Sequence, residues 1–223
     1  AAKVSSIGQL FRGNTLISSF DELKYFTNVT ELFASAFNGC TNLRNVSLDN
    51  IVKVGDYAFQ GDAMLESANM PYVTQIGQMA FYQCAALQNV SMPSIQVLGN
   101  RVFEGASVPG VQILRSLVTA GAKSFYNALN VVEFVAPCLS AVAETMLNRC
   151  SALENVYVGA ISQVGRYAFE RSGALKAVVI NNTNVASLPY TDAFTGTTCS
   201  IYVPDSSISA YTADSKWSTF ASR

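Results

Sequence analysis

The sequence has no histidine and few charged residues. Among 223 residues, 14 Lys and Arg stand against 15 Asp and Glu, which gives a formal net charge of −1. Without histidine, the chain has neither a His-based catalytic triad nor a histidine metal ligand. The motifs of a serine-hydrolase elbow, a phosphate-binding loop, a paired-cysteine site and a calcium loop are missing too. We therefore expect no metal and no cofactor.

Runs of basic residues and long hydrophobic runs are also missing. The first absence argues against binding to nucleic acid, which requires a basic stripe. The longest apolar stretches, such as VVEFVAPCL at 131–139, are interrupted by a charge or a proline. They fall short of the roughly 20 residues that span a bilayer, so we expect no membrane-spanning helix. The first residues, AAKVSSIGQLFRGN, carry no signal-peptide pattern, which a processed secreted chain would also lack.

What the sequence does contain is a repeat of 22 residues. Phenylalanine recurs at this interval in similar phrases, as in VGDYAFQG at 54–61, IGQMAFYQ at 76–83 and VGRYAFER at 164–171. A fixed period of about 20 to 29 residues is typical of a solenoid, whose units bury their apolar faces only by stacking on one another. The repeated positions are Phe37, Phe59, Phe81, Phe103, Phe125 and Phe169, with Leu147 in the one intervening place.

A segment that begins six residues after most of these positions predicts a β-strand. It reads LRNVSL at 43–48, LQNVSM at 87–92, LENVYV at 153–158 and LKAVVI at 175–180. Its last four positions alternate as a half-buried strand does. The residues expected to point inward are Val46 with Leu48, Val90 with Met92, Val156 with Val158 and Val178 with Ile180.

The fourth repeat departs from this spacing. Val111 and Ile113 reproduce the inward pattern one residue early, which would turn Gln112 toward solvent. We expect a small bulge near Pro109 and Gly110 to absorb the shift.

Other repeated positions complete the predicted coil. Glycine stands four residues before most of the phenylalanines, where it permits a positive φ or close approach of two backbones. We expect a 3-10 or helical turn at each Ala-Phe pair and a short extra strand at segments such as VTQIG, 73–77. Two further apolar lines should be buried: Ile51, Val73, Ile95, Leu117, Leu139 and Ile161, and Val54, Ile76, Leu98, Val142 and Val164.

Both ends of the chain depart from the repeat, as terminal caps do. In SFDELKYF at 19–26, Ser19 and Glu22 have the spacing of a capping box at the start of a helix. Near the other end, Asp205 or Ser206 is expected to cap a second helical segment. Its apolar residues are Ile208, Tyr211, Trp217 and Phe220.

The repeats resemble the BspA-like subclass of leucine-rich repeats, whose units read approximately I-G-x-x-A-F-x-x-C-x-x-L-x-x-V-x-I-P. VTQIGQMAFYQCAALQNVSMP at 73–93 matches this unit nearly letter for letter, and the resemblance covers residues 30 to about 204. Members are mainly surface and secreted proteins of anaerobic oral and gut bacteria and some protozoa, associated with adhesion and protein recognition. The resemblance therefore implies a leucine-rich repeat fold and an extracellular or cell-surface location.

Taken together, these patterns predict a leucine-rich repeat solenoid of about seven to eight right-handed coils. We expect one slightly curved parallel sheet, short 3-10 or helical turns on the opposite side, and helical caps at both ends. The predicted divisions are an N-terminal cap at 1–29, repeats at 30–204 and a C-terminal helical cap at 205–223.

The outward residues of the strands form the natural binding surface of a solenoid. In the first half they are small and polar, whereas Tyr157, Val179 and Tyr202 are large enough to anchor a partner. A solvated face, or one covered by another domain, remains the alternative. The predicted binding residues are Asn89, Ser91, Gln112, Glu133, Val135, Asn155, Tyr157, Val179 and Tyr202.

The acidic residues and the cysteines allow two other interpretations. Glu133 and Glu154 on successive strands have the separation of a retaining glycosidase pair, but an open sheet offers no pocket to hold a sugar. The five cysteines are interpreted mainly as small buried hydrophobes, since those in one repeat column lie about 10 Å or more apart, too far for a disulfide.

The sequence thus favours a non-catalytic recognition module of a cell-surface or secreted protein. We expect a monomer that binds a protein through the sheet face, with a glycan as the alternative ligand. A glycoside hydrolase that uses Glu133 and Glu154 is the third interpretation.

Overall fold

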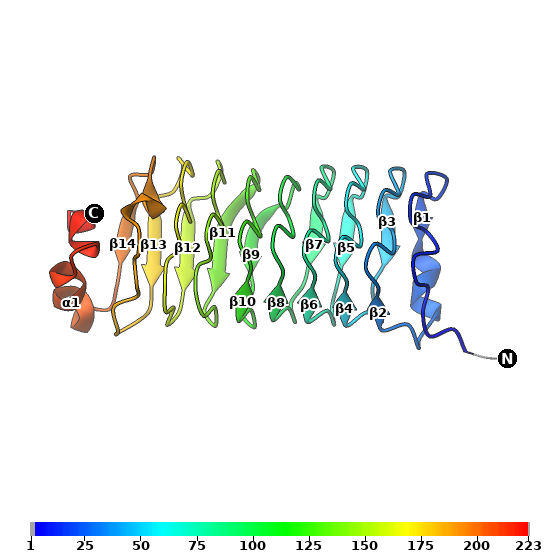
Figure 1. The fold of residues 1–223 in the computed structure, drawn as a ribbon, viewed down its shortest axis with the longest axis horizontal. Helices are drawn as coiled ribbons and strands as arrows, with labels where there is room; N and C mark the ends of the chain where they lie inside the picture. Colours follow the sequence, from blue (N-terminus) through cyan, green and yellow to red (C-terminus); the bar gives the residue numbers. More distant parts are fainter. Residues whose placement is uncertain (1–2, 223) are drawn as a thin grey trace.

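The structure is a computed structural model that describes residues 3–222, and it is an elongated stack of coils (Figure 1). The N-terminal segment and helix α1 (Ile208–Ala213) lie at opposite ends of the stack. Successive strands pair in parallel along the stack, as in β3 with β5 and β12 with β13. The predicted solenoid of parallel strands is therefore confirmed.

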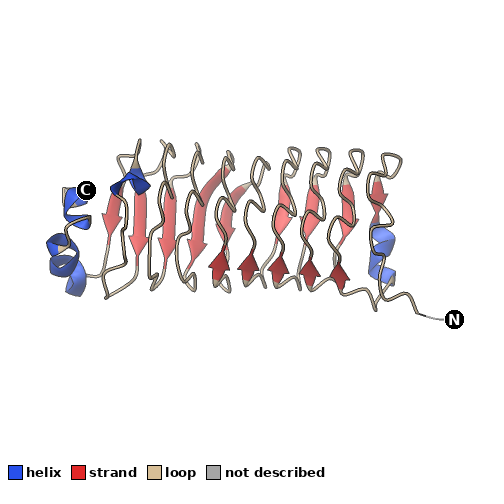
Figure 2. Ribbon diagram, viewed as in Figure 1, coloured by secondary structure: helices blue, strands red, loops and turns tan. Residues whose placement is uncertain are grey.

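One face of the stack carries two sheets, whose strands are mostly longer than those of the second face; Figure 2 shows all strands in red. The first has the order β1-β3-β5-β7 and the second the order β14-β13-β12-β11-β9. The strands are β1 (Ser19–Phe20), β3 (Asn45–Ser47), β5 (Ser67–Asn69), β7 (Asn89–Ser91), β9 (Gly110–Ile113), β11 (Val131–Ala136), β12 (Asn155–Val158), β13 (Ala177–Ile180) and β14 (Ser200–Tyr202).

The single sheet expected on this face is thus divided between β7 and β9. Pro109 stands directly before β9, and Gly110 has a φ of +53°. Proline lacks the N–H that a ladder needs, and a left-handed residue turns the backbone away from the strand direction. Pairing therefore stops at β7 and begins again at β9.

A second face carries a five-stranded sheet of two-residue strands in the order β10-β8-β6-β4-β2. These are the short extra strands that the sequence predicts, with β6 inside the VTQIG segment. The strands are β2 (Glu31–Leu32), β4 (Lys53–Val54), β6 (Gln75–Ile76), β8 (Val97–Leu98) and β10 (Thr119–Ala120).

The Ala-Phe segments form turns, and the helical turns expected there are mostly absent from the described residues. The residue two before the phenylalanine is left-handed, with a φ of +59° at Tyr57 and +52° at Met79, which interrupts a helix. The backbone N–H of the phenylalanine bonds instead to the next coil, as from Phe59 to the Ala80 carbonyl at 2.8 Å. Only the last such segment is a 3-10 helix, η2 (Thr191–Phe194).

The phenylalanines form a ladder of rings through the centre of the stack. Phe59, Phe81 and Phe103 are fully buried, with ring centroids 5.1 and 5.4 Å apart in succession. Leu147 interrupts the ladder after Phe125. The ring of Phe134, from β11, packs edge-on against the ring of Phe125. Both further apolar lines predicted from the sequence are buried as well.

Glycine in the repeated position is required for close approach of two coils. A Cβ at Gly99 would lie 2.5 Å from the backbone nitrogen of Gln78 in the preceding coil. Backbone contacts at that distance do not occur, so any side chain there would push the coils apart.

The expected orientation of the fourth repeat is wrong. Val111 and Ile113 are 52% and 48% exposed, whereas Gln112 is buried with 5% exposure. Gln112 keeps the 22-residue spacing from Val90, and its amide nitrogen donates to the Pro109 carbonyl oxygen at 2.6 Å, which satisfies the buried polar group. The extra residue is Val132 on the neighbouring strand β11, where the register shifts between 131 and 133.

The N-terminal segment is capped differently from the capping-box prediction. Ser19 lies in strand β1, which pairs with β3, and it is not the N-cap of a helix. The helix that follows is the 3-10 helix η1 (Asp21–Tyr25), whose N-cap is Phe20 and which has no side-chain cap. Leu23 is the buried residue of this turn. A strand is favoured because β3 offers an unpaired edge.

The C-terminal segment is helical, as expected. It comprises η3 (Asp205–Ser207), α1 and η4 (Trp217–Phe220), and neither Asp205 nor Ser206 forms a side-chain cap. Tyr211 and Trp217 are buried against the last coil, whereas Ile208 is 47% exposed. Within residues 3–222, no helix has both the length and the apolar character needed to cross a membrane.

Candidate functional site

Five outward residues of the second sheet form a continuous line across its strands, which we call the apolar row. The strand registers place Ile113 opposite Val135, Val135 opposite Tyr157, Tyr157 opposite Val179, and Val179 opposite Tyr202. Neighbouring strands lie about 4.8 Å apart, so the row is about 19 Å long. The sequence predicts four of these five residues at the surface.

The apolar row is accessible to solvent. Tyr157 is 40% and Tyr202 55% exposed, and Val135 and Val179 are half-buried between them. Ile113 completes the row at 48% exposure, and sequence analysis missed it. A strict 22-residue count from Ser91 would have found it, because the strand of the fourth repeat is not shifted.

The corresponding positions of the first sheet are polar. Ser47, Asn69 and Ser91 face one another in register, and Asn45, Ser67 and Asn89 form a parallel polar line. Asn89 and Ser91 are exposed as predicted. The face therefore has a polar half and an apolar half that meet at the division between β7 and β9.

Of the remaining predicted site residues, Glu133 and Asn155 lie opposite each other beside the apolar row, both half-buried. Gln112 is excluded from the surface, since its side chain points into the core. Asn89 and Ser91 thus belong to the first sheet, and the other predicted binding residues, except Gln112, lie in or beside the apolar row.

The two glutamates weighed as a glycosidase pair are not directly opposed. Glu133 faces Asn155, and Glu154 stands directly before β12. The Glu154 carboxylate pairs with the Lys176 ammonium at 2.8 Å. The Glu154 carboxylate is thus already engaged in an ion pair. The surface around the two glutamates is also open, whereas cleavage of a sugar requires two carboxyl groups that enclose the scissile bond.

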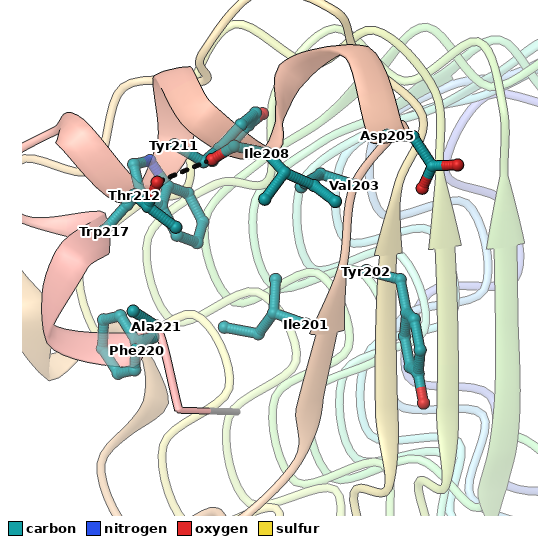
Figure 3. Close-up of a pocket in the computed structure, with 10 residues that line it drawn as sticks. All are labelled: Ile201, Tyr202, Val203, Asp205, Ile208, Tyr211, Thr212, Trp217, Phe220 and Ala221. Atoms are coloured by element: carbon teal, nitrogen blue, oxygen red, sulfur yellow. Dashed lines mark hydrogen bonds between the residues drawn. The ribbon is translucent and has the colours of Figure 1, made fainter.

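An apolar groove of about 260 Å³ lies where the last strand meets the C-terminal helices (Figure 3). Ile201 points into this groove toward Trp217 and Phe220, and Tyr202 points to the other side of β14. The groove and the apolar row therefore meet at β14, because Tyr202 belongs to the row and is also among the residues that line the groove.

A second hollow lies on the sheet face where the two sheets separate. It is open and of mixed character, with Val90 and Pro109 in its lining beside the polar side chains of Ser67, Asn69, Asn89 and Ser91. Hydroxyl and amide groups of this kind can hydrogen-bond to sugar hydroxyls.

The cysteines form no disulfide among the described residues. Cys40, Cys84 and Cys150 are buried in one repeat column, as the sequence predicts, whereas Cys138 is exposed. Burial raises the pKa of the Cys150 thiol to about 12, which keeps it protonated and unreactive. Over residues 3–222, no cluster of three or more potential metal-ligating side chains occurs.

The stacked coils, the parallel strands and the apolar columns of one period are typical of a leucine-rich repeat protein. The sequence pattern of the BspA type leucine-rich repeat region matches six copies, over residues 9–131 and 74–200. The chain belongs to this family, as the repeats themselves indicate.

A solved structure shows the same fold. A leucine-rich repeat protein of T. pallidum is 25% identical, with a TM-score of 0.59, and the alignment covers 66% of this chain and 72% of that one. A leucine-rich repeat protein from Bacteroides ovatus is 16% identical, with a TM-score of 0.47 and coverage of 80% and 65%. The comparison with curated proteins gives no match.

The fold class bears directly on the kind of function. Solenoids of this type present extended surfaces for binding, and their repeats generally carry no catalytic machinery. The chain is therefore a repeat module of a class that is generally non-catalytic.

Proposed function

We propose that this chain is the recognition module of a cell-surface or secreted protein and that it binds a protein partner through the apolar row. The observation that carries the proposal is the alignment of five apolar side chains on neighbouring strands of the second sheet. Contiguous exposed apolar surface is characteristic of protein interaction sites. Tyrosine is also among the residues that contribute most to such interfaces.

The surroundings of the row favour a protein over a sugar. Glu133 and Asn155 flank it on one side, so that polar groups border an apolar centre as in typical protein interfaces. Only two of its five side chains are aromatic, and Val179 separates them. A sugar-binding surface built on stacking would need adjacent aromatic rings.

Changing Tyr157 and Tyr202 together to serine is expected to weaken association at least tenfold, because both rings lie at the surface where a partner would bury them. Stability should change by about 0.5 kcal/mol or less for each substitution, the usual range for exposed positions. Affinity for a partner isolated with the wild-type chain is measured by titration calorimetry, and stability by denaturant unfolding.

The matched control changes Tyr25 and Tyr72 to serine, two tyrosines that are 75% and 62% exposed outside the row. The control should bind as the wild type does. Equal losses of affinity in both double variants would contradict a role for the row. A stability loss of several kcal/mol in the first variant would mean that its rings belong to the core.

A glycan is the second candidate ligand, favoured by the amide and hydroxyl groups that line the hollow between the two sheets. A glycan array distinguishes the two ligands. Binding to the array that disappears in Asn69→Ala with Asn89→Ala, and persists in the tyrosine double variant, would assign the face to sugar recognition.

The proposed location is outside the cell, which the family resemblance supports, and the proposed working state is a monomer. Protease added to intact cells that produce the natural protein should cleave this segment if the location is right. Protection of the segment in intact cells would contradict it.

A further inference from the structure

A column of small residues runs through the turns of the stack, three positions after each ring of the ladder. We call it the turn column. Asp62 is its only acidic residue, and it is fully buried between Cys40 of the preceding coil and Cys84 of the following coil. The column consists of Cys40, Asp62, Cys84, Ala106, Ala128, Cys150, Ser172 and Thr197.

Cys84, Cys150 and Ser172 of the turn column make the same kind of hydrogen bond to the preceding coil. The Cys84 thiol donates to the Phe59 carbonyl at 3.1 Å, and the Cys150 thiol donates to the Phe125 carbonyl at 3.2 Å. In both cases the acceptor lies 25 residues earlier, in the preceding coil. Where the column residue is a cysteine of this kind, its side chain therefore links its coil to the one before it.

Ser172 shows that one side chain can make two such links. Its hydroxyl donates to the Leu147 carbonyl at 2.7 Å, again 25 residues earlier. The same oxygen accepts from the backbone N–H of Cys150, the column residue before it, at 3.1 Å. A polar side chain at this position can therefore donate to a carbonyl of the preceding coil and accept from the backbone N–H of the preceding column residue.

Asp62 makes the second of these two contacts with one of its carboxyl oxygens. Its Oδ1 accepts from the backbone N–H of Cys40 at 2.8 Å, as Ser172 does from Cys150. Its Oδ2 is buried without a hydrogen-bond donor. The carbonyl 25 residues earlier is that of Phe37, itself an acceptor. A carboxylate can only accept hydrogen bonds. A charged Asp62 therefore cannot donate to the Phe37 carbonyl as Ser172 does to the Leu147 carbonyl.

We propose that Asp62 is a neutral carboxylic acid in the folded protein, that its Oδ2–H donates to the Phe37 carbonyl, and that it acts as a pH-sensitive latch between the N-terminal coils. The neutral acid reproduces both hydrogen bonds of Ser172. Loss of its proton breaks the link to Phe37 and leaves a charge in the core, which weakens the packing of the coils around it.

The groups around Asp62 do not offset its charge. The titratable groups that face it are the thiols of Cys40 and Cys84, and neither provides a positive charge. Burial raises the pKa of Asp62 to about 8, although the backbone N–H groups of Cys40 and Gly39 oppose the rise. Burial, followed by the Asp62 charge, raises the pKa of the Cys40 thiol to about 11, so this thiol stays neutral over the same range.

The direction of the pH effect follows from these pKa values. The folded state holds the Asp62 proton up to about pH 8, whereas the unfolded chain releases it near its ordinary pKa of 3.8. The contribution of the latch is therefore complete below pH 3.8 and is lost as the pH rises toward 8. Across this window the folding equilibrium constant should fall about tenfold per pH unit on account of this one group.

The most direct test follows the carboxyl carbon of Asp62 by NMR in the full wild-type chain, with Asp62→Asn to assign the signal. A titration midpoint within about one unit of pH 8 supports the proposal. A midpoint below about pH 5 overturns it, because the carboxyl would then be charged at neutral pH. This measurement needs no variant to remain stable, since the assigned signal is that of the wild-type chain.

The stability test compares the wild type with Asp62→Asn, whose amide can accept from Cys40 and donate to Phe37 at every pH. The ratio of their unfolding constants, measured in denaturant at pH 5, 6, 7 and 8, should change about tenfold per unit in favour of the asparagine variant. The matched control is Asp49→Asn, at an exposed carboxyl. A ratio for Asp62→Asn that stays constant over these pH values, as expected for the control, overturns the latch.

Discussion

Replacing Phe81 with alanine is expected to lower the free energy of unfolding by about 3–5 kcal/mol, the usual range for a buried phenylalanine. The Phe81 ring is fully buried and lies between those of Phe59 and Phe103, at centroid distances of 5.1 and 5.4 Å. Its backbone N–H bonds to the Val102 carbonyl at 3.0 Å, so the coils cannot readily close around the cavity. Denaturant unfolding measures the effect.

The control for this prediction is Phe33→Ala. Phe33 stands outside the ladder and is 47% exposed, so its loss should change stability by about 0.5 kcal/mol or less. If Phe81→Ala unfolds at the same denaturant midpoint as the wild type, the ring ladder does not stabilise the stack.

Replacing Gly159 with alanine is expected to destabilise the protein by about 1–3 kcal/mol, because it overpacks a contact between backbones. Gly159 follows β12 and is buried, and an added Cβ would lie 1.9 Å from the carbonyl oxygen of Pro137 in the preceding coil. The clash involves a main-chain atom held in the stack. Relief therefore requires the two coils to separate. Thermal or denaturant unfolding of the purified variant measures the loss.

Gly173→Ala provides the matched control. A Cβ at Gly173 would meet no atom within 4 Å, and neither glycine has a positive φ. The control should leave stability unchanged or raise it by about 0.4–1 kcal/mol, since alanine restricts the unfolded chain. Equal destabilisation of both variants would show that the conformation of glycine matters at these sites and that the contact with Pro137 does not.

Much of the fold could be predicted because each apolar column repeats with one period. Phe81 and Ile95 needed no knowledge of their neighbours, since residues 22 positions away in either direction have the same character. Such a repeat buries its apolar side chains only by stacking, which fixes the solenoid. The ends were harder, because Ser19 has a capping-box spacing but instead joins β1 at the open edge of β3.

The candidate site was predicted where alternation along one strand decides which side chains face out. Tyr157 lies between inward Val156 and Val158, and the structure places it at the surface. The same reasoning failed at Gln112 and Ile113, since hydropathy favoured the valine and isoleucine as the buried residues. The parallel register with β11 overrides that preference by pairing Gln112 with Phe134.

The sequence by itself determined the period, the columns and the two faces of each strand, because these depend on local alternation and on repetition. Only the tertiary structure decided how neighbouring coils fit. The division of the sheet at Pro109, the joining of five side chains into the apolar row, the contact at Gly159 and the enclosure of Asp62 between Cys40 and Cys84 all depend on it. Each is a relation between residues of adjacent coils, whose spacing and register are set by the backbone ladders and by packing across the whole stack.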